Sequence, residues 1–394
     1  MNKLVNQNVL LKPGSQTALR SANQQRIVDV LQASGQLSQA QLARETGLAP
    51  ATVSNIVREL VAKKVLATTS AGGGKRHAVQ LAQNAGLVAG IDYGHRHLTV
   101  AIADMGHNIL SERRVELGPG ISADEGIGMA ANLLGQALDS IGESLEAVSA
   151  IGMGLPAPID ARTGKVGGPS ILPGWVGVDP AALASERIGQ RVVVDNDANL
   201  GVLAEHTWGA ATGIDNVAYL KLSEGVGAGL ILGGQLFRGP GGTAGEIGHT
   251  TIDEFGPVCR CGNRGCLETI VAARSVIDLL EPRYGPGLSI AEIVRMANAG
   301  DHACSRILSD TGRQVGVAIA NLCNLFNPDL VIIGGELAQA DELLLAPIRE
   351  MVRRCGIPSA AARLEIRRAG LADRSHVLGA VALGLLEATP QMAS

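Results

Sequence analysis

One short stretch limits how this chain can fold more than any other, because it gathers four candidate metal ligands. A histidine closes the sequence GEIGH, and three cysteines follow it in a glycine-rich loop, all within 18 residues. An imidazole and three thiolates make a complete tetrahedral ligand set for structural zinc. Since the set leaves no open position, we expect the metal to clamp the loop rather than to catalyse. The predicted zinc ligands are His249, Cys259, Cys261 and Cys266.

The alternative is a group of ordinary core cysteines, which behave as small hydrophobic residues. A polar, glycine-rich loop that holds three of the six cysteines is unlike core packing. The start of the sequence lacks the apolar segment and cleavage site of a secretory signal. We therefore expect a cytoplasmic protein, where a cysteine cluster more often binds metal than forms disulfides. Cys304, Cys323 and Cys355 are interpreted as ordinary buried or partly buried thiols.

Length and composition indicate an α/β protein with more than one domain. The chain has 394 residues, of which 46% are hydrophobic and 51 are glycine, and this length favours two or three domains. No apolar run reaches the ~18 residues that would suggest a membrane span. The formal net charge of −4 is unevenly distributed, because residues 1–82 carry ten Lys and Arg against three Asp and Glu. A basic head on an acidic body suggests that the first module binds a polyanion.

The basic module, at residues 18–82, has the spacing of a winged helix-turn-helix and follows a flexible tail at 1–17. Gly47 permits the tight turn of the motif, and Pro50 suits the first turn of its second helix. The expected elements are helices at 21–35, 39–46 and 50–64 and strands at 65–69 and 77–81, which flank a basic glycine-rich tip.

In such modules the second helix of the motif lies in the major groove of DNA. Its exposed residues are predicted to contact bases or nearby phosphates, while the arginine of the helix and the basic wing tip hold backbone phosphates. The alternative is a three-helix protein-interaction module with a solvated basic face. The predicted DNA-binding residues are Thr52, Ser54, Asn55, Arg58, Lys75 and Arg76.

From residue 86 onward the pattern changes to buried strands that end in glycine-rich turns. Two strand–turn–strand units, one opening each half of the remaining chain, suggest two α/β lobes. We expect residues 86–195 and about 372–394 to form the first lobe. Residues 196–371 would form the second, with the zinc loop and an oligomerisation surface.

The sequence resembles the ROK family of repressors and sugar kinases. The resemblance covers residues 18–390. It implies an α/β two-lobed actin/hexokinase-like fold, here with the N-terminal winged helix-turn-helix domain of the regulator branch. The matching segments are GIDYG at 90–94, NDAN at 196–199, GEIGH at 245–249, the cysteine loop through Glu268, and NPDLVIIGG at 327–335.

The resemblance implies a sugar pocket between the lobes, and five residues fall on the family's sugar-contacting positions. Carboxylate and amide groups suit a sugar because they can pair with several hydroxyl groups. One ring nitrogen of the histidine would bind zinc and the other a sugar hydroxyl. The alternatives are helix capping for Asp197 and solvated loop carboxylates for Glu246 and Glu268. The predicted sugar-binding residues are Asn196, Asp197, Glu246, His249 and Glu268.

Asp197 also falls on the general-base position of the family's kinases, but both phosphate loops depart from the kinase pattern. His95 and Arg96 stand where the kinases carry small residues, and Glu224 replaces a threonine in the second loop. A carboxylate held ~4 Å from a phosphate charge costs roughly 4 kcal/mol at an effective dielectric constant of ~20. We therefore predict no catalytic residue, no useful ATP binding and no kinase activity.

These features together favour a sugar-responsive DNA-binding transcriptional regulator, mainly a repressor of carbohydrate metabolism, associated with the nucleoid. A sugar or sugar-phosphate effector would close the lobes and change the affinity for double-stranded operator DNA. Paired half-sites imply a homodimer or a homotetramer. Two alternatives remain: an ATP-dependent sugar kinase with a DNA-binding head, and a regulator controlled by a protein partner.

Overall fold

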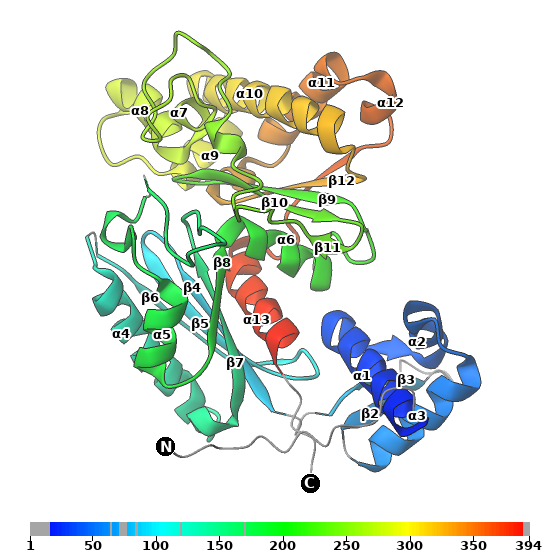
Figure 1. Cartoon of the computed structure of the whole chain (residues 1–394). Helices are drawn as coiled ribbons and strands as arrows, with labels where there is room; N and C mark the ends of the chain where they lie inside the picture. Colours follow the sequence, from blue (N-terminus) through cyan, green and yellow to red (C-terminus); the bar gives the residue numbers. More distant parts are fainter. Residues whose placement is uncertain are drawn as a thin grey trace. The chain divides into compact units, whose positions relative to one another are not determined.

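A computed structural model describes residues 16–63, 65–70, 77–82, 86–118, 120–168 and 171–388 (Figure 1). These residues form two compact units. The first contains the described residues up to Leu87 together with Ala103–Asn108. The second contains Val88–Ile102 and Ile109–Glu387. None of the helices in the described ranges has both the length and the apolar character needed to cross a bilayer.

The first unit is a small helical module with a three-stranded sheet of order β1-β3-β2. Ser38 begins α2 with a reciprocal cap, because its hydroxyl accepts from the Gln41 amide and the Gln41 side chain accepts from the Ser38 amide. Gly47 ends the helix in a left-handed conformation at φ 67°, which glycine adopts without strain. The elements are α1 Gln16–Ser34, β1 Leu37–Ser38, α2 Gln39–Thr46, α3 Pro50–Ala62, β2 Leu66–Ser70 and β3 His77–Leu81.

Helix α1 begins at Gln16 rather than near Ser21 as predicted. Residues 16–20 include a single large apolar side chain, Leu19, and so give no apolar periodicity, although most of them are compatible with a helix. The apolar face of the module is buried as expected, with Ile27, Leu42 and Val53 fully enclosed. The predicted wing tip at 71–76 lies outside the described residues, and so does Lys64.

The second unit contains two five-stranded sheets, one in each lobe. The first lobe has the strand order β6-β5-β4-β7-β8, with α13 on one face and α4 and α5 on the other (Figure 1). Gly152 lets α13 lie directly on β7, because a Cβ atom there would stand 2.0 Å from the Ala380 carbonyl oxygen. The elements are β4 Leu87–Tyr93, β5 His97–Asp104, β6 Ile109–Glu116, α4 Ala123–Asp139, η2 Leu145–Ala147, β7 Val148–Leu155, η3 Pro173–Trp175, α5 Pro180–Ile188, β8 Val192–Asn196, η6 Ala372–Arg374 and α13 Ser375–Glu387.

The second lobe has the strand order β11-β10-β9-β12-β13. Helix α6 covers one face, and α10 lies on the other with its neighbours (Figure 1). Alternate β9 residues accordingly enter different apolar clusters, Leu220 with the α8–α11 side and Tyr219 with the α6 side. The elements are α6 Asp197–Thr207, β9 Val217–Leu222, β10 Val226–Leu232, β11 Gln235–Leu236, η4 Ile247–His249, α7 Glu268–Val271, α8 Ala273–Tyr284, α9 Ile290–Asn298, α10 His302–Phe326, β12 Leu330–Gly334, η5 Glu336–Ala340, α11 Glu342–Cys355, α12 Pro358–Ala361 and β13 Glu365–Arg368.

Candidate functional site

The four predicted zinc ligands converge in the loop between β11 and α7. The candidate donor atoms of His249, Cys259, Cys261 and Cys266 all lie within 4.8 Å of one another. Two short bridges, Thr251 with Cys266 and Val258 with Arg264, fold the loop back on itself. Gly265 is required at the bend, because its φ is 63° and a Cβ atom there would meet the Asp253 carbonyl oxygen at 1.5 Å.

The chemistry of this cluster fits a bound divalent cation. The Nδ1 atom of His249 lies 3.6 Å from the Cys259 Sγ, and the Sγ atoms of Cys261 and Cys266 are also 3.6 Å apart. Burial and the neighbouring thiols raise the pKa of Cys266 to about 12. Burial also raises the pKa of Cys259, whereas hydrogen bonds from the Asn263 backbone and the neighbouring thiols lower that of Cys261. A coordinating metal would deprotonate all three thiols. The remaining cysteines are free, and Cys355 is exposed rather than buried or partly buried as predicted.

The five predicted sugar-binding residues line a single pocket. Asn196 and Asp197 come from the β8–α6 junction, and Glu246 and His249 from the segment around η4. Glu268 lies at the start of α7. The free volume of this pocket is about 50 Å³.

Two of these residues are held firmly by the protein. Asn196 caps α6, since its Oδ1 accepts from the Ala198 amide at 2.9 Å and its Nδ2 donates to the Ala157 carbonyl at 3.2 Å. The Glu268 carboxylate is buried and accepts from the Val226 amide at 2.9 Å and from Arg260 at 2.7 Å. Asn196, rather than Asp197, thus provides the side-chain cap, and Glu268 is not a solvated loop carboxylate.

Glu246 and His249 complete the polar wall of the pocket. The Nε2 atom of His249 lies 3.8 Å from a Glu246 carboxylate oxygen, while the other ring nitrogen faces Cys259. Burial raises the pKa of Glu246, and the negative charges of Asp197 and Glu268 raise it further. One nitrogen of the His249 ring therefore faces the cysteine cluster, and the other faces the pocket.

Lys221 is a pocket residue that the sequence interpretation did not identify. Its amine contacts the Asp197 carboxylate, and the exposed fractions of the two side chains are only 14% and 7%. Lys221 lines both this pocket and a second cavity. The sequence does show Lys221 as a lone charge within the apolar strand VAYLKL. Its partner, Asp197, becomes evident only when the sheet is packed against α6.

The second cavity is larger, at about 420 Å³, and follows the two glycine-rich turns. In the first turn His95 and Arg96 are exposed, and the His97 Nε2 lies 2.9 Å from the Asp92 carboxylate. Arg96 reaches Glu224 of the second turn at 2.5 Å. Arg96 and Glu224, one from each glycine-rich turn, are therefore paired with each other at this cavity.

The predicted DNA-reading residues of the first unit lie on α3. Asn55 and Arg58 are exposed, and Thr52 and Ser54 are half-buried. An open hollow between α1 and α3 is lined by Thr52, Asn55 and Arg58. Lys75 and Arg76 fall outside the described residues.

Arg20 lines the same hollow from α1, and the sequence interpretation did not assign it. Its guanidinium lies 2.5 Å from the Glu59 carboxylate of α3, which holds the pKa of that carboxyl below its usual value. Lys63 contacts the same carboxylate at 3.3 Å. The longer extent of α1 explains the omission, because a helix starting at Ser21 excludes Arg20.

Comparison with known proteins defines the class of this chain. A model of the ROK family matches residues 88–386, and a winged helix-turn-helix DNA-binding model matches residues 20–66. The chain belongs to the ROK family. The resemblance and the fold class predicted from the sequence are thereby confirmed.

Two relatives match nearly the whole chain. The xylose repressor of Caldicellulosiruptor bescii is 28% identical over 389 residues, with 94% of this chain and 97% of that protein covered. The DNA-binding transcriptional dual regulator NagC of Escherichia coli K12 is 31% identical over 381 residues, with 93% and 92% covered. Both alignments include the DNA-binding module as well as the two lobes.

Solved structures show similarity to both branches of the family. A ROK family transcriptional regulator described as a homologue of the E. coli MLC protein has a TM-score of 0.76 and 26% identity, covering 93% of this chain and 97% of that one. A ROK family glucokinase from Streptomyces griseus, solved with glucose and AMPPNP, has a TM-score of 0.67 and 29% identity. It covers 76% of this chain and 99% of that one.

Proposed function

We propose that this protein is a sugar-responsive DNA-binding transcriptional regulator that represses genes of carbohydrate metabolism. The similar repressors extend over both the winged helix-turn-helix module and the two-lobed body. The observation that carries the proposal is the position of His249, which belongs to both the cysteine cluster and the polar pocket. Such a regulator acts in the cytoplasm, where its operator DNA is.

The proposed effector is a small sugar or sugar phosphate that binds in the pocket of Asn196, Asp197, Glu246, His249 and Glu268. These groups present several hydrogen-bond acceptors and one imidazole, which suits the hydroxyl groups of a sugar. The small free volume supports a change on binding: Lys221 or Arg260 must shift to admit the ring. A ligand shifts a conformational equilibrium only through its different affinity for the two states, and these movements supply that difference.

The proposed metal is structural Zn²⁺, held by His249, Cys259, Cys261 and Cys266. Bound zinc supplies a fixed positive charge and a tetrahedral link between the two ends of the loop. With Nδ1 of His249 facing the cluster, Nε2 faces Glu246 and can donate to a sugar hydroxyl. The chain's own residues thus orient the ligand, and the cluster fixes the loop that carries them.

We propose that the chain is not a kinase. Asp197, at the position of the kinase base, is paired with the Lys221 amine, so its carboxylate is already engaged by the protein itself. Glu224 and Glu336 bring negative charge to the cavity where a nucleotide phosphate would have to lie. The relatives named as repressors support the same conclusion.

On the DNA side, we propose that Thr52, Ser54 and Asn55 contact bases or nearby phosphates and that Arg58, Lys75 and Arg76 hold phosphates. Arg20 adds a positive charge beside this surface. A symmetric homodimer or homotetramer would present two such surfaces to paired half-sites. The proposed domain boundaries are the tail 1–17, the DNA-binding domain 18–82 and the two lobes that follow.

The experiment is fluorescence anisotropy of the full-length, zinc-loaded protein on DNA from its own promoter, repeated with xylose, glucose, N-acetylglucosamine and its 6-phosphate. We expect tight binding that one of these sugars weakens by at least tenfold. Binding unaffected by any sugar favours control by a protein partner, and sugar-dependent ADP release in a coupled assay favours a kinase.

A matched pair of variants tests the DNA surface itself. Arg58→Ala should weaken binding to every sequence and reduce the slope of log affinity against log salt by about one. Arg295→Ala, on the exposed side of α9, serves as the control and should leave the slope unchanged. An unchanged slope in Arg58→Ala would remove that residue from the proposed surface.

A further inference from the structure

Arg96 links the two lobes across the second cavity. It stands in the turn between β4 and β5 of the first lobe, and its Nη2 atom lies 2.5 Å from Glu224 and 4.0 Å from Glu336. Glu224 occupies the β9–β10 turn, and Glu336 begins η5 after β12, both in the second lobe. One cation from the first lobe therefore meets two carboxylates from the second.

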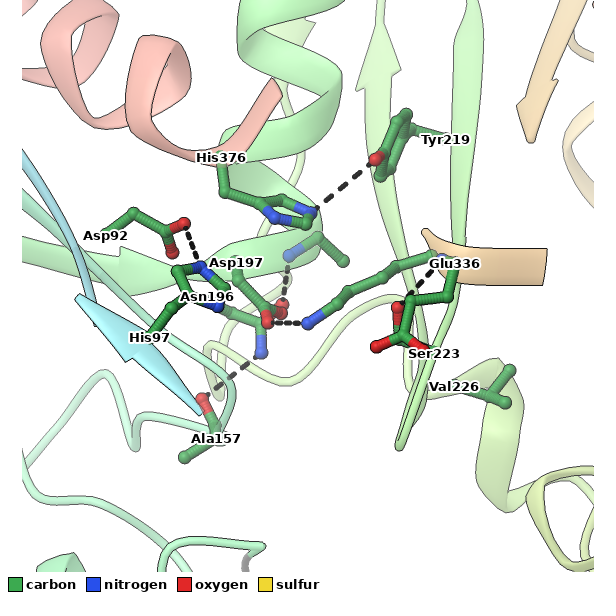
Figure 2. A network of polar contacts seen from close by, with 12 residues as sticks. Asp92, His97, Ala157, Asn196, Asp197, Tyr219, Ser223, Val226, Glu336 and His376 are labelled. Atoms are coloured by element: carbon green, nitrogen blue, oxygen red, sulfur yellow. Dashed lines mark hydrogen bonds and ion pairs between the residues drawn. The ribbon is translucent and has the colours of Figure 1, made fainter. Parts of the chain in front are cut away.

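Both sides of this contact are held in place by local bonds. In the first lobe the Gly94 amide donates to the His97 carbonyl at 2.8 Å, and His97 also contacts Asp92 (Figure 2). A Cβ atom at Gly94 would lie 2.3 Å from the His97 ring, so glycine lets the turn close and project Arg96 outward. In the second lobe the Glu336 amide donates to the Ser223 hydroxyl at 3.1 Å.

The Ser223–Glu336 bond has a specific consequence for the two carboxylates. Ser223 immediately precedes Glu224, so the bond ties the β9–β10 turn to the segment after β12 (Figure 2). Glu224 and Glu336 are thereby kept near each other even though like charges repel. Arg96, a cation from the opposite lobe, pairs with both carboxylates and relieves this repulsion.

We propose that Arg96, Glu224 and Glu336 form an ion-pair clasp that holds the lobes together across the second cavity, so that closure requires no ligand in that cavity. The clasp lies apart from the sugar pocket and does not depend on the proposed DNA or sugar function. It assigns a role to Arg96, to which the proposed function gives none.

The clasp is weak, so salt or the loss of one charge should be enough to open it. The exposed fractions of the Arg96, Glu224 and Glu336 side chains are 60%, 25% and 43%. Pairs this exposed shift an equilibrium by roughly two- to fivefold and are screened by salt. Removing Arg96 should have a larger effect than neutralising one carboxylate, because it leaves two negative charges facing each other.

Amide hydrogen exchange of the full-length, zinc-loaded protein tests the clasp without any ligand. In Arg96→Ala, peptides that cover residues 94–97 and 223–226 should both exchange roughly two- to fivefold faster, since opening exposes both turns. Glu224→Gln should give a smaller increase in both. Salt should accelerate exchange in the wild type but not in Arg96→Ala.

Arg114→Ala is the matched control, because Arg114 lines the same cavity but pairs with Glu116 on its own strand. It should leave residues 223–226 unchanged. The clasp is overturned if Arg96→Ala alters only its own turn, or if Arg114→Ala has the same effect on the second lobe. Protection of both turns by added ATP in the wild type would also overturn it, because a nucleotide would then be the link.

Discussion

The cleft between the lobes has two halves, the pocket around Asp197 and the larger second cavity. The volume of each half is a poor guide to which of them binds a ligand. The half around Asp197 has about 50 Å³ of free volume, yet it collects the five polar residues predicted to bind a sugar. The other half has about 420 Å³ and is crossed by the protein's own ion pairs. Convergent polar groups, more than volume, identify the proposed ligand site.

Lys221 marks the boundary between the halves. It lines both cavities and contacts Asp197. On one side the charges are arranged for a ligand, and on the other they neutralise one another.

The largest expected effect comes from the cysteine cluster, although no cysteine needs to touch the ligand. Cys261→Ser should lose the metal and weaken sugar binding more than about a hundredfold, since His249 and Glu268 each make a charge-assisted hydrogen bond. Metal content by mass spectrometry and sugar affinity by calorimetry measure this. The exposed Cys355→Ser is the control. A metal-free variant that binds sugar with normal affinity would show that sugar binding does not depend on the cluster.

Asp197→Asn should weaken sugar binding by about 10- to 100-fold. The substitution removes the charge that accepts from a sugar hydroxyl and also leaves the Lys221 amine without its partner. Titration calorimetry should show this loss with an unchanged melting profile for the zinc loop. Glu292→Gln, an exposed acid on α9, is the control. Equal affinities in both variants would remove Asp197 from the ligand site.

Sugar binding should depend on pH through Glu246, whose pKa is raised by burial and by Asp197 and Glu268. As the pH falls through this raised pKa, the carboxylate is protonated and affinity should fall by about three- to tenfold. Folding responds in the opposite sense: the stabilising effect of protonation is complete below the unfolded pKa and is lost as the pH rises through the folded one. Glu246→Gln should flatten both profiles; an unaltered affinity profile would contradict this assignment.

The smallest effect is expected in the other half of the cleft. Glu224→Gln should change sugar affinity by less than about fivefold, because it weakens an exposed ion pair. It should also leave ATP binding undetectable, since Glu336 still faces the cavity. Calorimetry with the sugar and with ATP compares the two halves in one protein. A large loss of sugar affinity would show that the halves are not separable.

Local sequence signals predicted much of this structure. The turn at Gly47, the proline at the start of α3 and the strands that end in glycine-rich turns are all encoded within a few residues. The family that the sequence resembles and the fold class that this resemblance implies are confirmed. The zinc ligands gather as their spacing suggested, while zinc itself and the sugar roles stay predictions.

Long-range contacts explain what the sequence could not supply. Lys221 meets Asp197 because β9 lies beneath the start of α6, and Arg96 meets Glu224 because two distant turns face each other. Neither partner can be read from local periodicity. Arg20 was missed for a different reason, since the first turn of α1 carries no amphipathic signal.

Calorimetric titration of the zinc-loaded protein, first with the sugar panel and then with ATP, tests the central claim most directly. The account predicts micromolar binding of at least one sugar or sugar phosphate in the absence of nucleotide, and no measurable binding of ATP with or without that sugar. Sugar binding that requires ATP, or micromolar ATP binding alone, would contradict it.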